Sequence, residues 1–320
     1  MLQQDAGVMA IVAILVLLFF CGGHNQEPVG CDWPIPETWG YGSSISPSFS
    51  PDNRSIAFVC DYAGNRDIWI NRIKSGLYPQ VQVTTSQEDE NSPTWSPDGR
   101  FLAYVRGKSG DRSIWLCSAE RRGGAQAVCL LPADEQFCYL DPMFDPEGGI
   151  ICIAEDKRDV GMSDFLYRLI RINRDRTTQI LLEVRGVILS QPRPTVEGIY
   201  FTSYQPTVCP PRPEVCYWER ASGQQRVVTP DPEAGFSAAT ASPNGRWLAC
   251  VGHGDGKQVQ IWDRQTNLLK MSVPGEGMSL CPTWSADSKQ LAYSQQTDQV
   301  RPSGQGKISD IFIYRLPAGF

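Results

Sequence analysis

The sequence predicts an all-β protein built as a closed ring of six four-stranded antiparallel sheets, a six-bladed β-propeller. The prediction rests on one pattern that occurs six times: a strand, a tight turn and a second strand, as in SPTWSPDGRFLAY at Ser92–Tyr104. A unit of about 45 residues with four strands is the period of a propeller blade. The turn position recurs every 43 to 50 residues, at Pro51, Pro97, Pro146, Val196, Pro243 and Ala286.

Each repeat supplies its strands in a fixed order. In the turn of the second copy, Pro97 presets φ, Asp98 tolerates the bend and Gly99 can adopt a positive φ. The run FLAY that follows has the length and the β-forming residues of a strand. An aromatic-rich strand comes next, and a short apolar strand usually completes the unit. The aromatic strands are DIWI, SIWL, FLYRL, CYWE, QIWD and DIFIY, and the closing strands are VQVTT, AVCLL, TQILL, RVVT and LLKMSV.

The sixth repeat ends at its third strand, IFIYRL, with four residues after Leu316. We therefore expect part of Val29–Tyr41 to supply the outermost strand of the sixth blade and to close the ring. The prolines of this segment are compatible with that position, because an edge strand has one side without a partner. The predicted organisation is a leader at residues 1–23, a linker with the closing strand at 24–43 and the propeller at 44–317.

The repeat P-x-[WF]-S-P-D-G-x-x-[IL]-A-[FY], with an aromatic strand after it, resembles the repeat of TolB-like β-propellers, which relatives of prolyl oligopeptidase also contain. It covers about Ser44 to Leu316. The resemblance implies a propeller scaffold without implying one activity, because such propellers carry many functions. TolB itself has an α/β domain before its propeller and the peptidases have a hydrolase domain; we expect neither in this chain.

The N-terminal residues predict export. Ala6–Phe20 is a run of 15 apolar or small residues, which is the length of a signal-peptide core and too short for a spanning helix. LFFC at Leu18–Cys21 resembles a lipobox, so Cys21 is the candidate lipid-attachment site of a periplasmic or cell-surface lipoprotein. Phe20 and the absence of Lys or Arg before Arg54 depart from that pattern, which leaves an uncleaved anchor as the alternative.

Eleven cysteines agree with an oxidising compartment, because the chain has no metal-binding spacing and only two histidines. The strongest candidate disulfide brackets the stiff segment PPRPEV, and two others join neighbouring strands of one blade. The alternative is that the strand cysteines are small core residues. The candidate pairs are Cys209–Cys216, Cys117–Cys129 and Cys138–Cys152.

Signatures of common catalytic sites are missing from the sequence. The two histidines are His24, beside the leader, and His253, in a glycine-rich hairpin, and there is no G-x-S-x-G elbow. A net charge of −6 without a Lys/Arg stripe argues against nucleic-acid binding. We therefore predict no catalytic residue, cofactor or metal ligand.

The sequence thus predicts a monomeric, non-catalytic binding module for a protein or an envelope polymer, with membrane contact only through its N-terminus. The loops between second and third strands are long and varied, and in a propeller they share one face, here called the long-loop face. Tyr62, Tyr204, Arg212 and His253 lie in these loops and are the candidate contacts, because Tyr and Arg are common interface anchors. The alternative is a hydrolase or lyase that uses carboxylates in the central channel.

Overall fold

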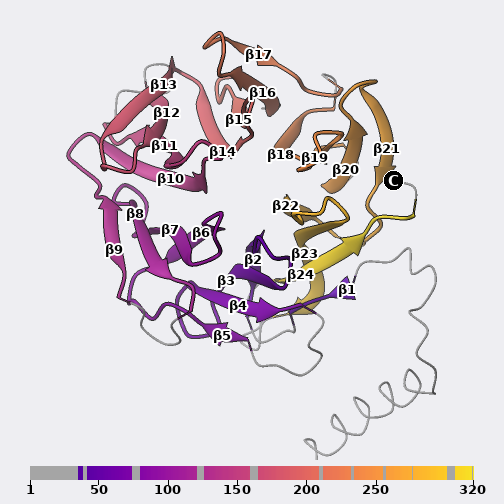
Figure 1. Ribbon diagram of the computed structural model, residues 1–320, viewed down its shortest axis with the longest axis horizontal. Coiled ribbons are helices and arrows are strands. Elements are labelled where there is room, and N and C mark those ends of the chain that lie inside the picture. Colours follow the sequence, from indigo (N-terminus) through magenta and orange to yellow (C-terminus); the bar gives the residue numbers. More distant parts are fainter. Residues whose placement is uncertain are drawn as a thin grey trace, which may run out of the picture. The chain divides into compact units, whose positions relative to one another are not determined.

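In the computed structural model the chain forms six four-stranded antiparallel sheets arranged as blades of a ring, which confirms the predicted fold (Figure 1). The structure describes residues 35–38, 42–73, 80–120, 126–158, 165–208, 212–231, 234–254, 257–275, 277–300, 307–318 and 320. Within these ranges there is no helix that could cross a membrane. The predicted leader and Cys21 lie outside them.

The blades follow one another along the chain, and strands are ordered from the channel outward. The first blade contains β2 (Ser44–Phe49), β3 (Ser55–Cys60), β4 (Asp67–Arg72) and β5 (Val81–Gln82). The second contains β6 (Glu90–Trp95), β7 (Phe101–Arg106), β8 (Ser113–Ser118) and β9 (Val128–Leu131). The third contains β10 (Phe137–Phe144), β11 (Ile150–Asp156), β12 (Leu166–Ile172) and β13 (Thr178–Arg185).

The other three blades repeat this order. The fourth contains β14 (Ile188–Pro194), β15 (Gly198–Tyr204), β16 (Glu214–Glu219) and β17 (Gln225–Val227). The fifth contains β18 (Phe236–Ala241), β19 (Trp247–Gly252), β20 (Gln258–Asp263) and β21 (Leu268–Ser272). The sixth contains β22 (Ser279–Trp284), β23 (Gln290–Val300), β24 (Lys307–Arg315) and, as its fourth strand, β1 (Ile35–Pro36).

The core lies between neighbouring blades. Second strands such as β19 are buried along their whole length, whereas fourth strands such as β17 are exposed. Each buried cluster joins consecutive blades, and one of them packs Phe58 of the first blade against Ile311 of the sixth. A sheet with two apolar faces must cover both of them, and the ring of blades provides that cover.

Four of the six turns use the same hydrogen bonds. In the first blade Ser50 Oγ donates to Asp52 Oδ1 at 2.6 Å and accepts from the Ser55 backbone N–H at 2.9 Å. The same pair of bonds recurs at Ser96, Ser242 and Ser285. Gly99 has φ 72°, as the turn prediction required. The serine before the turn proline therefore anchors each of these hairpins.

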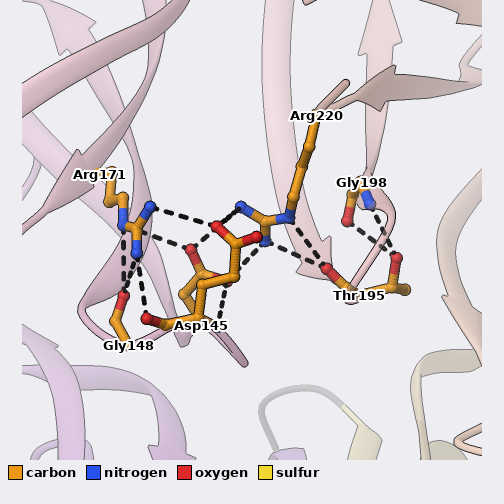
Figure 2. Close-up of polar contacts among 7 residues, drawn as sticks. Asp145, Gly148, Arg171, Thr195, Gly198 and Arg220 are labelled. Atoms are coloured by element: carbon orange, nitrogen blue, oxygen red, sulfur yellow. Dashed lines mark hydrogen bonds and ion pairs between the residues drawn. The ribbon is translucent and has the colours of Figure 1, made fainter. Parts of the chain in front are cut away.

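The third and fourth blades lack this serine and are joined by a different network (Figure 2). Asp145 and Thr195 stand in its place, and Arg220 donates to Asp145 Oδ1 at 2.5 Å and to the Thr195 carbonyl at 3.1 Å. Arg171 approaches the other oxygen of Asp145 at 3.4 Å. The Asp145 side chain is fully buried, so the two guanidinium groups compensate its charge, and the bond from Arg220 joins the fourth blade to the third.

The candidate disulfides are not formed among the described cysteines, all eight of which are free thiols. The strand register explains why two of the predicted pairs, Cys117–Cys129 and Cys138–Cys152, were wrong: Cys129 lies opposite Trp115 and Cys138 lies opposite Glu155. A disulfide needs Cα atoms within about 7 Å and side chains that face each other. In the third pair, Cys216 is a buried thiol 3.2 Å from Ser203 Oγ, and Cys209 lies outside the described residues.

The first described segment of the chain contacts both the sixth and the first blade. Ile35 pairs with Ile313 and Pro36 with Phe312 in the antiparallel ladder of β1 and β24. The Glu37 carbonyl accepts a hydrogen bond from Asn71 Nδ2 of β4 at 2.7 Å. Thr38 Oγ1 accepts from the Ile311 backbone N–H at 2.8 Å and donates to Asp310 Oδ1 at 2.9 Å. Whether ring closure depends on this short segment stays a prediction.

We predict that Thr38→Val lowers the free energy of unfolding by about 1–3 kcal/mol, because it leaves the buried Ile311 N–H without its acceptor. Thr177→Val, which removes a hydroxyl that bonds Asp175 in an exposed turn, is the matched control. If the segment closes the ring, hydrogen exchange in Thr38→Val should rise in β24 and β2 and remain unchanged in β10–β16. An equal increase in hydrogen exchange in all six blades of Thr38→Val would contradict this role.

Candidate functional site

A bulge in the innermost strand of every blade forms the wall of the central channel. In all six inner strands the register with the second strand shifts at one point. One non-glycine residue at each shift has a positive φ of 48° to 54°, a conformation that such residues rarely adopt. Five of these six residues precede a proline. They are Ser46, Ser92, Asp141, Gln191, Ala238 and Cys281.

Five of these bulge residues line a cavity of about 570 Å³, here called the channel pocket. Ala238 is the exception, and the fifth blade contributes Ser237, His253 and Lys257 instead, so all six blades supply lining residues. Tyr204 ends β15 and His253 follows β19. Because these positions belong to loops between second and third strands, the pocket lies toward the long-loop face.

A hydrogen-bond network connects the bulge residues across blades. Asp141 Oδ1 accepts from Ser92 Oγ at 2.8 Å, and its Oδ2 accepts from the Gln191 backbone N–H at 2.9 Å. Gln191 Nε2 in turn lies 3.8 Å from Cys281 Sγ. Both oxygens of the Asp141 carboxylate are thus engaged by the second and fourth blades, which holds it rigidly in the wall.

Arg193 brings a positive charge into this wall. It lies at the end of the bulge in β14, opposite Tyr200 of β15. Burial lowers its pKa, while the nearby Cys281 and Asp141 act in the opposite direction. In the described part of the chain, its one hydrogen bond runs from Nη1 to the Pro192 carbonyl at 3.3 Å. The guanidinium group therefore has donors available for a ligand in the pocket.

Ser237 and His253 form a polar pair in the same pocket, with 2.7 Å between Ser237 Oγ and His253 Nε2. Burial, and to a lesser extent the charge of Lys257, lowers the pKa of His253, so its ring is neutral at pH 7. The distance is suitable for a nucleophile and its base. Among the described residues, however, no carboxylate hydrogen-bonds to the His253 ring, and the orienting group of a triad is missing there.

Two of the four predicted contact residues line the channel pocket and two do not. Tyr204 and His253 line the channel pocket, whereas Tyr62 and Arg212 do not. Tyr62 is 59% exposed and packs edge-on against Trp69. Sequence reasoning missed the bulge residues and Arg193. In five repeats the bulge residue stands directly before the first proline of the repeat, and in the fourth repeat Arg193 stands directly after that proline. The side chains at these two positions vary between the copies.

Two buried carboxylates lie outside the pocket, between the first and second blades. Asp67 and Glu90 are 1% and 0% exposed, and Arg106 Nη2 lies 2.8 Å from Glu90 Oε1. Burial and the charge of Glu90 raise the pKa of Asp67 to about 6. Among the pocket residues that the structure describes, Asp141 is the single carboxylate. No group of three metal-binding side chains was found in the described ranges.

No protein-family model and no curated protein matches the sequence. Among solved structures, TolB from Acinetobacter baumannii is similar with a TM-score of 0.60 and 15% identity, over 84% of this chain and 63% of that chain. This chain therefore spans less than two thirds of the length of that TolB.

Two enzymes show comparable similarity. An oligogalacturonate lyase in complex with manganese has a TM-score of 0.59 and 13% identity, over 87% of this chain and 90% of that one. A gluconolactonase from Xanthomonas campestris has a TM-score of 0.60 and 14% identity, over 86% of each chain. At these identities the comparisons establish the propeller fold, which this chain shares with TolB-like proteins and with enzymes.

We predict that Asp67→Asn changes the pH dependence of stability. The pKa of Asp67 in the fold, about 6, lies above the ordinary value of 3.8, so the buried carboxylate destabilises the fold progressively as pH rises from about 4 to 6. Relative to the unmodified protein, the variant should therefore gain on the order of 2 kcal/mol between pH 4 and pH 7 in urea unfolding.

Asp175→Asn is the control for this measurement. It removes an exposed carboxyl group whose pKa is lowered by a hydrogen bond from Thr177. The substitution should therefore change the pH dependence of stability only below pH 4. Parallel stability curves for Asp67→Asn and the unmodified protein from pH 4 to pH 7 would contradict the prediction.

Proposed function

We propose that the chain is an exported, non-catalytic binding module that holds part of a protein or an envelope polymer in the channel pocket, entered from the long-loop face. The observation that carries this proposal is the pocket itself, a cavity of about 570 Å³ to which every blade contributes. Cavities of that size, lined by a few fixed polar groups, are typical of ligand sites.

The chemistry of the lining supports a polar ligand. Asp141, Gln191 and Arg193 are held by the rigid inner strands, which is the arrangement that fixes a bound group most accurately. Tyr204 and His253 add an aromatic and an imidazole ring on the side of the long loops. Hydroxyl groups complete the wall, from Ser46, Ser48, Ser92, Ser190, Thr202, Ser237 and Thr283.

Export is part of the proposal and rests on the apolar run Ala6–Phe20, with Cys21 as the lipid-attachment site. Disulfides would have supported export, but the described cysteines are free thiols, so the proposal of export does not rest on them. The similar solved structures include TolB and enzymes, so the fold is compatible with a binding scaffold without selecting it.

To test the proposal, the unfolding temperature of the full chain can be measured with a panel of envelope oligosaccharides and peptides. A ligand that binds the native state raises this temperature. We expect at least one ligand whose effect is lost in Tyr204→Ala and kept in Tyr62→Ala, because only Tyr204 lines the pocket. A panel without any effect, or ligands insensitive to Tyr204, would contradict binding in the pocket.

The hydrogen bond between Ser237 and His253 favours one second candidate function, a serine hydrolase. On this alternative a fluorophosphonate should label Ser237 covalently, and His253→Ala should abolish the labelling. Ser203, whose hydroxyl lies beside Cys216 and away from the pocket lining, serves as the internal control. An unlabelled Ser237 would leave the non-catalytic proposal as the better explanation.

A further inference from the structure

We propose that the channel pocket selects its ligand by a carboxylate group, which binds to the guanidinium of Arg193. The inference rests on the proposed function, because it assumes that the pocket binds a ligand, and it names the chemical group that is recognised.

Arg193 is an exception among equivalent positions of the repeat. In every blade, the residue two places after the bulge residue is the one at which pairing with the second strand resumes. In the other five blades this residue is small or uncharged. A cation that is half-buried in the channel wall loses part of its hydration, so its presence in one blade calls for a compensating anion. The five equivalent residues are Ser48, Thr94, Met143, Thr240 and Thr283.

The described residues do not provide that anion within ion-pair distance. Asp141 is the nearest candidate, but both of its oxygens accept hydrogen bonds, from Ser92 and from the Gln191 backbone. The bond from Arg193 to the Pro192 carbonyl is long, at 3.3 Å, and uses one nitrogen of the guanidinium group. The other N–H donors of the guanidinium fork therefore remain for a bidentate partner.

The charge of the pocket favours a monoanion. Burial raises the pKa of Cys281 and lowers that of His253, so both are neutral at pH 7. The charged groups of the lining are then Arg193 and Lys257, both positive, and Asp141, negative, which leaves a formal net charge of +1. A single carboxylate neutralises this charge, and its shape matches a guanidinium fork, whereas a phosphate dianion would also meet the negative charge of Asp141.

The remainder of the ligand is expected to be neutral and polar. Seven serine and threonine hydroxyl groups line the pocket beside the phenol of Tyr204, and those of Ser92 and Thr202 already bond within the wall. The others can donate or accept, which suits a body that carries hydroxyl or amide groups. A sugar acid and the C-terminal residue of a peptide both combine such a body with a carboxylate. The carboxylate is the shared chemistry, and the experiment distinguishes the two sources.

The test is calorimetric titration of the full chain with matched probes: D-glucuronate against D-glucose, a tripeptide acid against its C-terminal amide, and inorganic phosphate. We expect a carboxylate probe to bind and its neutral counterpart not to bind. Arg193→Gln should weaken that binding by about 10- to 100-fold, the usual effect of losing a hydrogen bond to a charged group. The affinity of Arg193→Lys should lie between those of the unmodified protein and Arg193→Gln, because lysine keeps the positive charge without the guanidinium fork.

Arg246→Gln is the matched control, because Arg246 lies on the exposed side of the turn in the fifth blade and should leave affinity unchanged. Alkylation of Cys281 provides a second measurement that needs no variant: its thiol lines the same pocket, so a bound carboxylate probe should slow its reaction with iodoacetamide.

The outcomes separate this inference from the proposed function. Glucuronate binding identifies a sugar acid and peptide-acid binding identifies a C-terminus, and either supports the inference. Equal binding of the neutral counterparts, a preference for phosphate, or full affinity in Arg193→Gln overturns it, although the pocket would still be a binding site. Failure of every carboxylate probe to bind at millimolar concentration overturns it as well.

Discussion

The packing of each blade against its two neighbours is the interaction on which the rest of this structure depends. A four-stranded blade cannot bury both of its faces alone, and the buried clusters accordingly cross from one blade to the next. Two indole groups add directional bonds at these boundaries: Trp95 Nε1 donates to the Ser48 carbonyl at 3.1 Å and Trp284 Nε1 to the Thr240 carbonyl at 3.0 Å. The aromatic positions of the repeat therefore belong to the inter-blade core.

This packing also explains how a repetitive chain makes a site that is not repetitive. The bulge of the inner strand recurs in every blade, and in five of the six blades it delivers the bulge side chain to the channel pocket. The identity of that side chain varies between blades, because it lines the pocket and not the apolar core between the blades. Serine, aspartate, glutamine and cysteine thus meet there, although the sequence separates them by about 45 residues each.

The fourth blade departs from the repeat in two places, and both departures have consequences. Its turn lacks the anchoring serine, and Arg220 ties it to the third blade through the buried Asp145. Its inner strand carries Arg193 where other blades have small or uncharged residues. Local rules are most often broken where a protein has a functional reason. In this propeller the irregular blade contributes the charge from which we infer ligand recognition.

The sequence alone was sufficient for the number of blades, the order of their strands and the turn chemistry, because these depend on residues close together in the chain. It was insufficient for the disulfides: Cys129 faces Trp115 and not Cys117, a matter of register that spacing does not reveal. It also could not bring Ser237 to His253, or Arg193 to Asp141 and Cys281. The first contact depends on the register of two strands within the fifth blade. The second requires the blades to be placed around a common axis, since only then do residues distant in sequence share one cavity.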